Sequence, residues 1–482
     1  MSAVPTPDPL RWKALATLGV AYLMVVLDVS IVNVALPSIQ EDLGFTTEDL
    51  QWVVSGYALT FGGFLLLGGR LGDLLGRRLI FTVGLGLFAL TSLLAGLSVN
   101  EGMLIATRIA QGAAGAILAP SVFSITLVTF AEGAERNKAL GILGAIAGSG
   151  AAIGVLAGGV LTEYAGWRWI FFVNVPIAIA TLFFVPRFVR ESKAEGLARH
   201  FDAWGAVTVT SSLMLLVFGL TQANRVGWAS AQTILVLTSS AVLMAIFLWL
   251  EHRSYSPLVR LSIFKRRTLA GANVIGFGLG TSIFAMFFLL TLYMQNVLSY
   301  TALKTGVAYL AVALTAVVAS GAAQALVTKL GVRPVLATGL LLLTAGLLYF
   351  TQISVGGSYL NDLLIGFLLI GVGLGFSFVP VSIAALAGIE GPEAGLASGL
   401  INTSQQIGGA LGVAILTTVA TTHTNTLLAN GDSQAQAFVG GFALAFLVAA
   451  CFAFVSVIIT LVVLKKDDLR VEEGQPVAAP AG

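Results

Sequence analysis

The chain is poor in charge and almost free of cysteine. Only 10% of its 482 residues are charged and 57% are hydrophobic, whereas about 25% charged residues is usual for a soluble domain. The single cysteine, Cys451, excludes an internal disulfide and a cysteine-based metal site. With a mean hydropathy of +0.95, this composition excludes a soluble monomer and a disordered chain. It indicates a protein that crosses a membrane many times.

Several other signals are also missing. The net charge of +2 gives no field that would attract nucleic acid. The three histidines, His200, His252 and His423, are too far apart in sequence to indicate a metal site. No Gly-rich phosphate loop ending in Lys and Ser or Thr is present, and the glycines of 371–375 follow no strand pattern. We therefore expect no metal, no cofactor and no nucleic-acid partner.

Long apolar runs are what the sequence has in abundance. A helix needs about 20 apolar residues to cross roughly 30 Å of hydrocarbon, and fourteen runs approach or exceed that length. They cover 13–36, 50–68, 79–98, 102–127, 138–162, 168–186, 203–221, 230–250, 269–293, 305–328, 334–352, 361–386, 396–422 and 438–464. None shows the strict alternation of a membrane β-barrel strand. The runs predict an all-α polytopic membrane protein with fourteen transmembrane helices.

Lys and Arg are divided unequally between the two sides of the predicted membrane. Loops on the side of the N-terminus hold 21 of the 25, while the opposite side holds only Arg168, Arg225 and Lys304. Because basic loops are retained in the cytoplasm, both termini are predicted to be cytoplasmic. The excess of Arg over Lys, with abundant Ala and Gly, points to a bacterium, and so to the bacterial cytoplasmic membrane.

Two parts of the sequence recur about 255 to 260 residues apart, which indicates two related halves. Residues 75–85 resemble 330–340, and the fourth run resembles the twelfth; chance matching of Gly- and Leu-rich helices is the alternative. We predict an N-terminal six-helix bundle over 1–200 and two additional helices over 201–252. A C-terminal six-helix bundle would follow over 253–466, with a cytoplasmic tail over 467–482.

Two charges remain deep inside the apolar runs, Asp28 in the first and Arg108 in the fourth. Each costs about 2.5–3.5 kcal/mol at a helix centre, so each needs a reason. Counted at 1.5 Å per residue, they lie at about the same depth. A static ion pair that fixes helix packing is one interpretation. The other is proton coupling, because a buried carboxylate whose cationic neighbour can move away is suited to binding and releasing a proton.

Four stretches carry a family resemblance. Residues 27–37 (LDVSIVNVALP) resemble the first-span signature of drug exporters of the major facilitator superfamily, and 69–78 (GRLGDLLGRR) resemble its loop signature between spans two and three. Residues 108–112 (RIAQG), which include Gln111, resemble the fourth-span signature. Residues 166–176 and the fourteen runs resemble the fourteen-span drug:proton antiporters. The resemblance implies two six-helix bundles and proton-coupled export by alternating access.

The loop between the second and third runs is predicted to form a conformational latch. Its three glycines would permit a tight turn, and its acid would meet a nearby Arg or the positive end of a helix. In the resembled superfamily this element is thought to stabilise one of two states. A topology determinant that merely keeps the loop cytoplasmic is the alternative. The residues concerned are Gly69, Gly72, Asp73, Gly76, Arg77 and Arg78.

Glycines also mark the fifth run, where they would let a facing helix approach closely. They include Gly150, Gly154, Gly158 and Gly159. The antiporter signature of the resembled family has Pro after its middle Gly, but this chain has Val155, which weakens the assignment to export.

Substrate recognition is predicted in an apolar and aromatic cavity near the bilayer midplane, between the halves. The candidates are Tyr57, Gln111, Phe284, Phe287, Phe288, Tyr293, Phe376, Phe378, Asn402 and Gln405, although most aromatic residues of such spans pack or face lipid. We expect small lipophilic or monocationic substrates, protons as the coupling ion and a monomer in the lipid bilayer. Uptake or exchange of a metabolite on the same fold is the alternative function, and an enzyme is not expected.

Overall fold

The computed structural model describes residues 9–130, 134–193, 202–254, 257, 259, 261–387 and 393–464, and all regular structure among them is helical. The N-terminal half contains α1 (Arg11–Leu43), α2 (Thr47–Leu75), α3 (Arg77–Gly96), α4 (Glu101–Thr129), α5 (Ala134–Ala165), α6 (Trp169–Phe172) and α7 (Asn174–Phe188). Two further helices follow, α8 (Ala203–Val226) and α9 (Ala231–Arg253), and then the short η1 (Leu261–Lys265). The C-terminal half contains α10 (Arg267–Leu292), η2 (Tyr293–Val297), α11 (Ala302–Leu330), α12 (Val332–Tyr349), η3 (Phe350–Gln352), η4 (Tyr359–Leu364), α13 (Ile365–Leu386), α14 (Glu393–Ala429) and α15 (Gln434–Val463).

Each of the fourteen predicted runs coincides with helical structure, because a backbone in hydrocarbon can satisfy its polar groups only internally. Thirteen described helical stretches are long and apolar enough to cross a membrane. The fifth run lies in α5, whose described apolar stretch, Ala152–Ala165, is shorter. The all-helical membrane fold is therefore confirmed, while the number fourteen stays a prediction.

The helices extend past the apolar runs because polar residues cap them. Thr46 accepts a hydrogen bond from the Asp49 N–H at the start of α2, and Asn100 accepts one from the Met103 N–H at the start of α4. Such caps satisfy N–H groups that have no partner within the helix. Helix ends thus lie in short polar turns at the two ends of the bundle.

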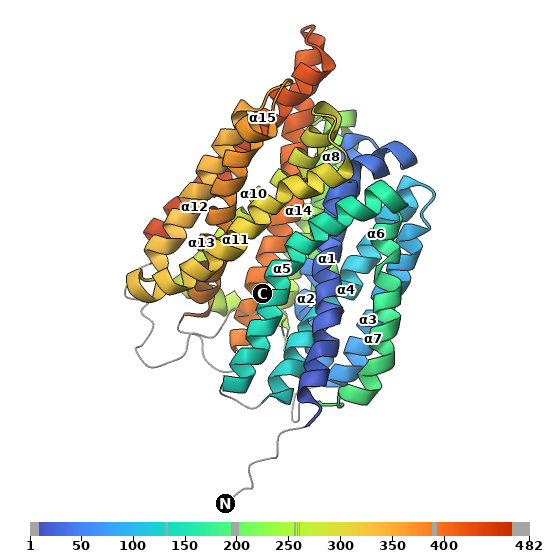
Figure 1. The fold of residues 1–482 in the computed structure, drawn as a ribbon, viewed down its shortest axis with the longest axis vertical. Coiled ribbons are helices and arrows are strands. Elements are labelled where there is room, and N and C mark those ends of the chain that lie inside the picture. The colour runs from blue at the N-terminus through green and yellow to red at the C-terminus, as the bar shows by residue number, and fades with distance from the viewer. Residues whose placement is uncertain are drawn as a thin grey trace, which may run out of the picture.

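The two halves form two bodies whose helices are tilted against each other, and they meet along helices from both sides (Figure 1). α2 packs against α14, where Thr403 donates a hydrogen bond to the Gly62 carbonyl at 3.1 Å and Ser55 donates one to the Ala410 carbonyl at 3.2 Å. α5 packs against α11. The halves are therefore joined mainly by two helix pairs.

The helices α8 and α9 form a hairpin at the edge of this contact. α8 packs against α2 and α14, one helix from each half, and Gln51 donates a hydrogen bond to Thr221 at 2.7 Å. Ser212 and Ser240 each donate to the other's backbone carbonyl, which joins α8 to α9. Most of α9 is exposed. The division of the chain into domains stays a prediction.

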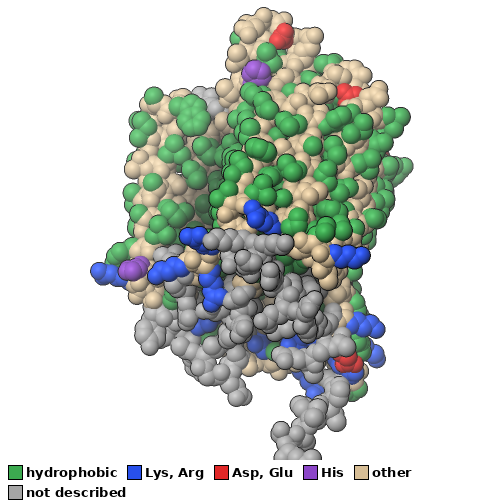
Figure 2. Space-filling model, turned by 90° about the vertical axis from the view of Figure 1, so that its left-hand side faces the viewer, with side chains coloured by type: hydrophobic (Ala, Val, Ile, Leu, Met, Phe, Trp, Pro, Cys, Tyr) green, Lys and Arg blue, Asp and Glu red, His purple; other side chains and the backbone are tan. Residues whose placement is uncertain are grey.

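Lys and Arg side chains gather toward the lower part of the molecule, and hydrophobic side chains cover the surface above them (Figure 2). The lower end also carries the N-terminal side of the chain. This pattern is the one that the loop charges predict, and the assignment of the lower end to the cytoplasm stays a prediction. We refer below to the N-terminal end and the opposite end of the bundle.

Candidate functional site

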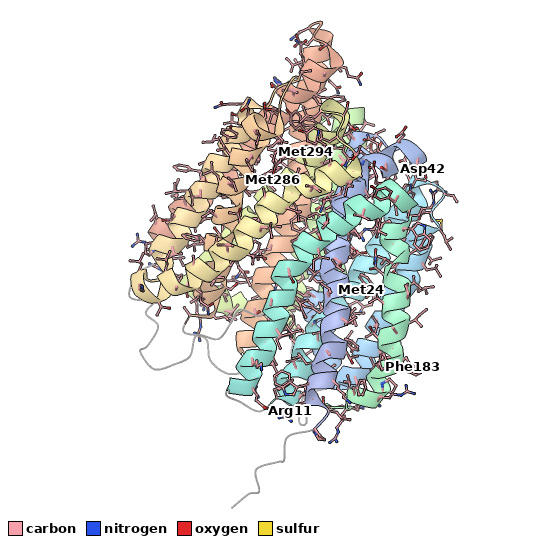
Figure 3. The ribbon with its side chains drawn as sticks, viewed as in Figure 1. Arg11, Met24, Asp42, Phe183, Met286 and Met294 are labelled. Atoms are coloured by element: carbon pink, nitrogen blue, oxygen red, sulfur yellow. The ribbon has the colours of Figure 1, made fainter. Side chains whose placement is uncertain are left out.

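A buried ion pair joins α1 to α4. The Arg108 guanidinium donates through Nη1 to Asp28 Oδ2 at 2.6 Å, and the side chains are 2% and 0% exposed. Met24, one helical turn before Asp28, marks the level of the pair near the middle of α1, between Arg11 and Asp42 (Figure 3). The two residues that the sequence placed at one depth are therefore in direct contact.

Two amides and a hydroxyl complete the surroundings of the Asp28 carboxylate. Gln111 Nε2 and Asn174 Nδ2 both donate to Oδ1, at 2.8 and 2.9 Å. The same two groups donate to Ser92 Oγ at 2.7 and 3.3 Å. Arg108 Nη1 also donates to Gln111 Oε1 at 2.6 Å. Gln111 is fully buried in this network, and its role in a substrate cavity stays a prediction.

Aromatic rings enclose the Arg108 side chain. Its Nε donates to the Val53 carbonyl at 2.9 Å, and its guanidinium carbon lies 4.3 Å from the Tyr57 ring centre and 5.7 Å from that of Phe171. Such cation–π contacts stabilise a guanidinium that has little access to water. Tyr57 is itself 2% exposed. Its ring covers Arg108, and its role in a substrate cavity stays a prediction.

All three hydrogen-bond donors to the Asp28 carboxylate come from the N-terminal half, two on α4 and one on α7. The carboxylate accepts three hydrogen bonds, so the charged form of Asp28 is satisfied without water. Sequence reasoning missed Asn174 and Ser92, although Asn174 lies in the quoted stretch 166–176. The network can hold a buried charged carboxylate. The role of the pair in proton coupling stays a prediction.

The turn between α2 and α3 is made by Gly76 alone, with a φ of 126°. Glu191, which follows α7, lies next to this turn. Its carboxylate accepts hydrogen bonds from the Arg78 and Leu79 N–H groups at 3.0 and 3.1 Å. An added Cβ on Gly76 would lie 2.9 Å from a Glu191 carboxylate oxygen. Sequence analysis missed Glu191, whose carboxylate accepts from backbone N–H groups that have no partner within α3 and lies at the positive end of that helix.

The other two loop glycines do not form the turn. Gly69 and Gly72 lie inside α2, which continues to Leu75, and an added Cβ on either would lie 3.6 Å from a side-chain atom of α4. Their assignment to a tight turn is wrong, because α2 continues as a helix through both positions. Arg77 begins α3. The Asp73 side chain lies outside the described residues, so its part in a latch stays a prediction.

The glycines of α5 meet two different neighbours. Added Cβ atoms at Gly150, Gly154 and Gly158 would lie 2.8, 1.9 and 2.7 Å from atoms of α1. At Gly159 the nearest atoms, at 2.9 Å, belong to α11 of the other half. At these glycines the helices approach closely, and their part in an antiporter motif stays a prediction. Val155 is buried at the same contact, where its carbonyl lies 2.5 Å from the position of an added Cβ on Gly306.

Four candidate cavity residues lie in the C-terminal half on α10 and η2. Phe288 and Tyr293 are fully buried in the hydrophobic core, and the Tyr293 hydroxyl donates to the Ser354 carbonyl at 2.7 Å. Packing buries both side chains in this state, and their assignment to a cavity wall stays a prediction. Phe284 is partly buried, and the Phe287 ring lies 4.9 Å from that of Tyr309. A cavity role for these two stays a prediction.

The remaining candidates lie on α13 and α14. Phe376 is partly buried and Phe378 is 39% exposed. Asn402 donates to the carbonyl of Ser398 in its own helix at 3.3 Å, and Gln405 is partly buried. A cavity role for all four stays a prediction. In the part of the chain that the structure describes, no three His, Cys, Asp or Glu side chains form a possible metal site.

A polar pocket lies between the halves at the opposite end of the bundle. Gln295 of η2 donates to the Val34 carbonyl of α1 at 2.8 Å, and Met294 marks this level near the upper end (Figure 3). Beside this hydrogen bond, a pocket of about 410 Å³ is lined by Ser38 and Glu41 from α1 and by residues around η2. The halves are thus in polar contact at this end.

Comparison with known proteins gives the same family throughout. The family profile of the Major Facilitator Superfamily matches residues 18–413. The puromycin resistance protein pur8 of Streptomyces alboniger is 38% identical over 472 residues, which is 96% of this chain and 93% of that protein. The cephamycin export protein CmcT of Amycolatopsis lactamdurans is 38% identical over 431 residues, 89% of each.

Among solved structures, an inward-facing bacterial homologue of the human lysosomal transporter Spinster has a TM-score of 0.63 at 16% identity, covering 96% of this chain and 99% of that one. This likeness supports the fold. Together with the match over most of the sequence, it shows that the chain belongs to the Major Facilitator Superfamily and is a membrane transporter rather than an enzyme.

Proposed function

We propose that the protein exports lipophilic antibiotics or related drugs across the bacterial cytoplasmic membrane in exchange for protons, by alternating access. Its relatives support the direction, since one is named for puromycin resistance and the other for cephamycin export. The observation on which proton coupling rests is the fully buried Asp28, paired with Arg108. Protons are the only coupling ion in this proposal, and no cofactor takes part.

The ion pair offers a way to couple a proton to a change of shape. Arg108 lies 2.6 Å from the Asp28 carboxylate, so it compensates the charged form of that side chain. Binding of a proton removes its charge and leaves the buried Arg108 with only neutral partners, which is costly in a low-dielectric interior. A rearrangement of α1 against α4 that restores the balance would then follow protonation. Release of the proton would reverse it.

The contacts between the halves supply the moving parts. α2 with α14 and α5 with α11 hold the halves together in the described state, and the Gln295–Val34 hydrogen bond joins them at the opposite end. Alternating access requires that contacts at one end open while those at the other end form. We propose a monomer, because each monomer of this fold carries both halves. Both termini would lie in the cytoplasm.

Substrate selection should follow from the shortage of charge within the spans. A small lipophilic compound, neutral or with one positive charge, fits a cavity between the halves with a single acid nearby. A dication would need a second carboxylate. Exposed acids such as Glu41 lie at the end of the bundle, beside the polar pocket, and far from the level of Asp28.

The test is directional flux in proteoliposomes. The purified protein would be reconstituted, and a pH gradient imposed without a membrane potential, with puromycin and ethidium as the first two compounds. Movement of either compound against the proton flow, with matching proton movement, is expected. Liposomes without the protein are the control. Flux of drug and proton in the same direction would contradict export.

Uptake or exchange of a small metabolite is the second candidate, and one observation favours it. Val155 stands where the antiporter signature has Pro, and its carbonyl packs against Gly306 of the other half. Val155→Pro would bring the chain to the exporter pattern. An uptake carrier would show drug-independent proton symport of a metabolite, and its direction would be visible in the same vesicles.

A further inference from the structure

An apolar groove runs along the outside of the N-terminal half between α1 and α5. It has a volume of about 230 Å³, and apolar residues and Gly19 line it, including Trp12, Leu15, Val20, Leu23 and Ile146. α1 and α5 lie side by side at the front of the molecule, and no described helix is drawn over their lower parts (Figure 1). Val20 is 47% exposed, so the groove is open to its surroundings.

The groove is long enough to hold an alkyl chain. Gly19 lines the groove, and a side chain there would enter it, because an added Cβ would lie 2.9 Å from Ile146 Cδ1. From Trp12 to Leu23 the helix rises by about 16 Å at 1.5 Å per residue. The hydrocarbon of one leaflet is about 15 Å thick. The groove therefore spans one leaflet, from the N-terminal end toward the midplane.

Positive charge stands at the mouth of the groove. Lys138 of α5 is exposed there, and the exposed Lys13 of α1 follows Trp12 in sequence, with its ammonium 5.7 Å from the centre of the Phe188 ring of α7. The Lys138 ammonium lies 5.2 Å from the ring centre of Trp12, which lines the groove. Beside them, the ion pair of Arg11 with Glu135, at 2.8 Å, ties α1 to α5. Tryptophan is the residue typical of the membrane interface, so the two ammonium groups lie at headgroup level.

We propose that this groove is a binding site for an anionic phospholipid, with one acyl chain between α1 and α5 and the phosphate held by Lys13 and Lys138. The two parts of the site complement the two parts of such a lipid. An apolar groove alone would accept the chains of any lipid, whereas basic side chains between helices select an anionic headgroup. This inference depends only on the membrane fold and not on the transported compound.

Native mass spectrometry of the full-length protein in detergent tests it. Dioleoyl phosphatidylglycerol and dioleoyl phosphatidylcholine carry the same chains and differ in headgroup charge. We expect tighter binding of phosphatidylglycerol to one site by about tenfold or more, and loss of that preference in Lys13→Gln/Lys138→Gln. Lys329→Gln, which removes an exposed lysine of α11 at the same end, is the matched control and should change nothing.

A second variant tests the groove itself. Val20→Trp fills it from the exposed side without entering the core, and it should weaken both lipids about equally. Equal affinity for the two lipids in the unmodified protein would overturn the proposal. So would phosphatidylglycerol binding that survives both variants, or equally tight binding of glycerol phosphate, which has no chain. Thermal unfolding of each variant would show that it remains folded.

Discussion

Replacing Asp28 by Asn separates the two interpretations of the buried pair. The new side chain keeps an oxygen for Gln111 and Asn174, but it presents an amide to Arg108 Nη1, which lies 2.6 Å from Oδ2 in the parent protein. Two donors would then oppose each other, and a guanidinium that is 2% exposed would lose its counter-charge. Removing one partner of a buried pair costs about 3–5 kcal/mol. We expect Asp28→Asn to lower thermal stability strongly.

The double variant Asp28→Asn/Arg108→Gln removes both charges. Two neutral amides can hydrogen-bond each other, and replacing a whole buried pair is often neutral for stability. We therefore expect the double variant to recover most of the lost stability. If Asp28 carries the proton, this stable protein is still uncoupled. If the pair only fixes packing, the double variant couples drug and proton flux normally.

The assay has two readouts on the same preparations, thermal unfolding in detergent and drug flux under a pH gradient in proteoliposomes. Asp42→Asn is the matched control, because the Asp42–Arg168 pair has a distance of 2.7 Å but is 44% and 39% exposed. Such exposed pairs contribute about 0–1 kcal/mol. Gradient-driven efflux at the parental rate by the double variant would refute proton coupling through Asp28. An Asp28→Asn protein as stable as the parent would refute the electrostatic reasoning.

Three more predictions follow from other parts of the structure. Glu191→Ala should cost about 1 kcal/mol at the N-terminus of α3, because two N–H groups lose their acceptor; faster hydrogen exchange at Arg78 would show it, and unchanged exchange would count against it. Gly158→Ala should lower the melting temperature, since its Cβ would lie 2.7 Å from a backbone oxygen of α1, at a cost of about 1–3 kcal/mol. Gly144→Ala, with nothing within 4 Å, is its control and should not destabilise. Monocations should be exported in preference to dications, at about one proton per substrate, because Asp28 is the one acid deep in the predicted spans; flux measured separately against pH gradient and membrane potential gives the ratio, and robust dication export at two protons would contradict it.

The fold could be predicted because the hydrophobic effect acts on long stretches of sequence. Every predicted run coincides with a helix. The ends were less accurate, since capping residues such as Thr46 extend helices into polar sequence. Gly69 and Gly72 were misplaced for a related reason, because glycine serves both turns and close helix contacts in membranes. Hydropathy cannot distinguish those two uses.

The site could be predicted only where it departs from its surroundings. Asp28 and Arg108 stand out as charges in apolar runs, and their contact followed from depth alone. Asn174 and Ser92 are neutral, and neutral polar residues are common in membrane helices, so neither was noticeable. Glu191 lies among the basic residues after α7, where charge indicates topology. Its contact with α3 depends on how two distant loops fold together.

The glycine contact between α5 and α11 has a kinetic consequence. Gly159 and Gly306 bring backbone directly against backbone across the two halves. Helices that meet at glycines can move past each other without forcing side chains through strained rotamers. This contact should therefore add little to the energy barrier for relative motion of the two halves. The barrier that sets the turnover rate would then lie elsewhere, in directional bonds such as Gln295 to Val34 that must break before the halves can rock.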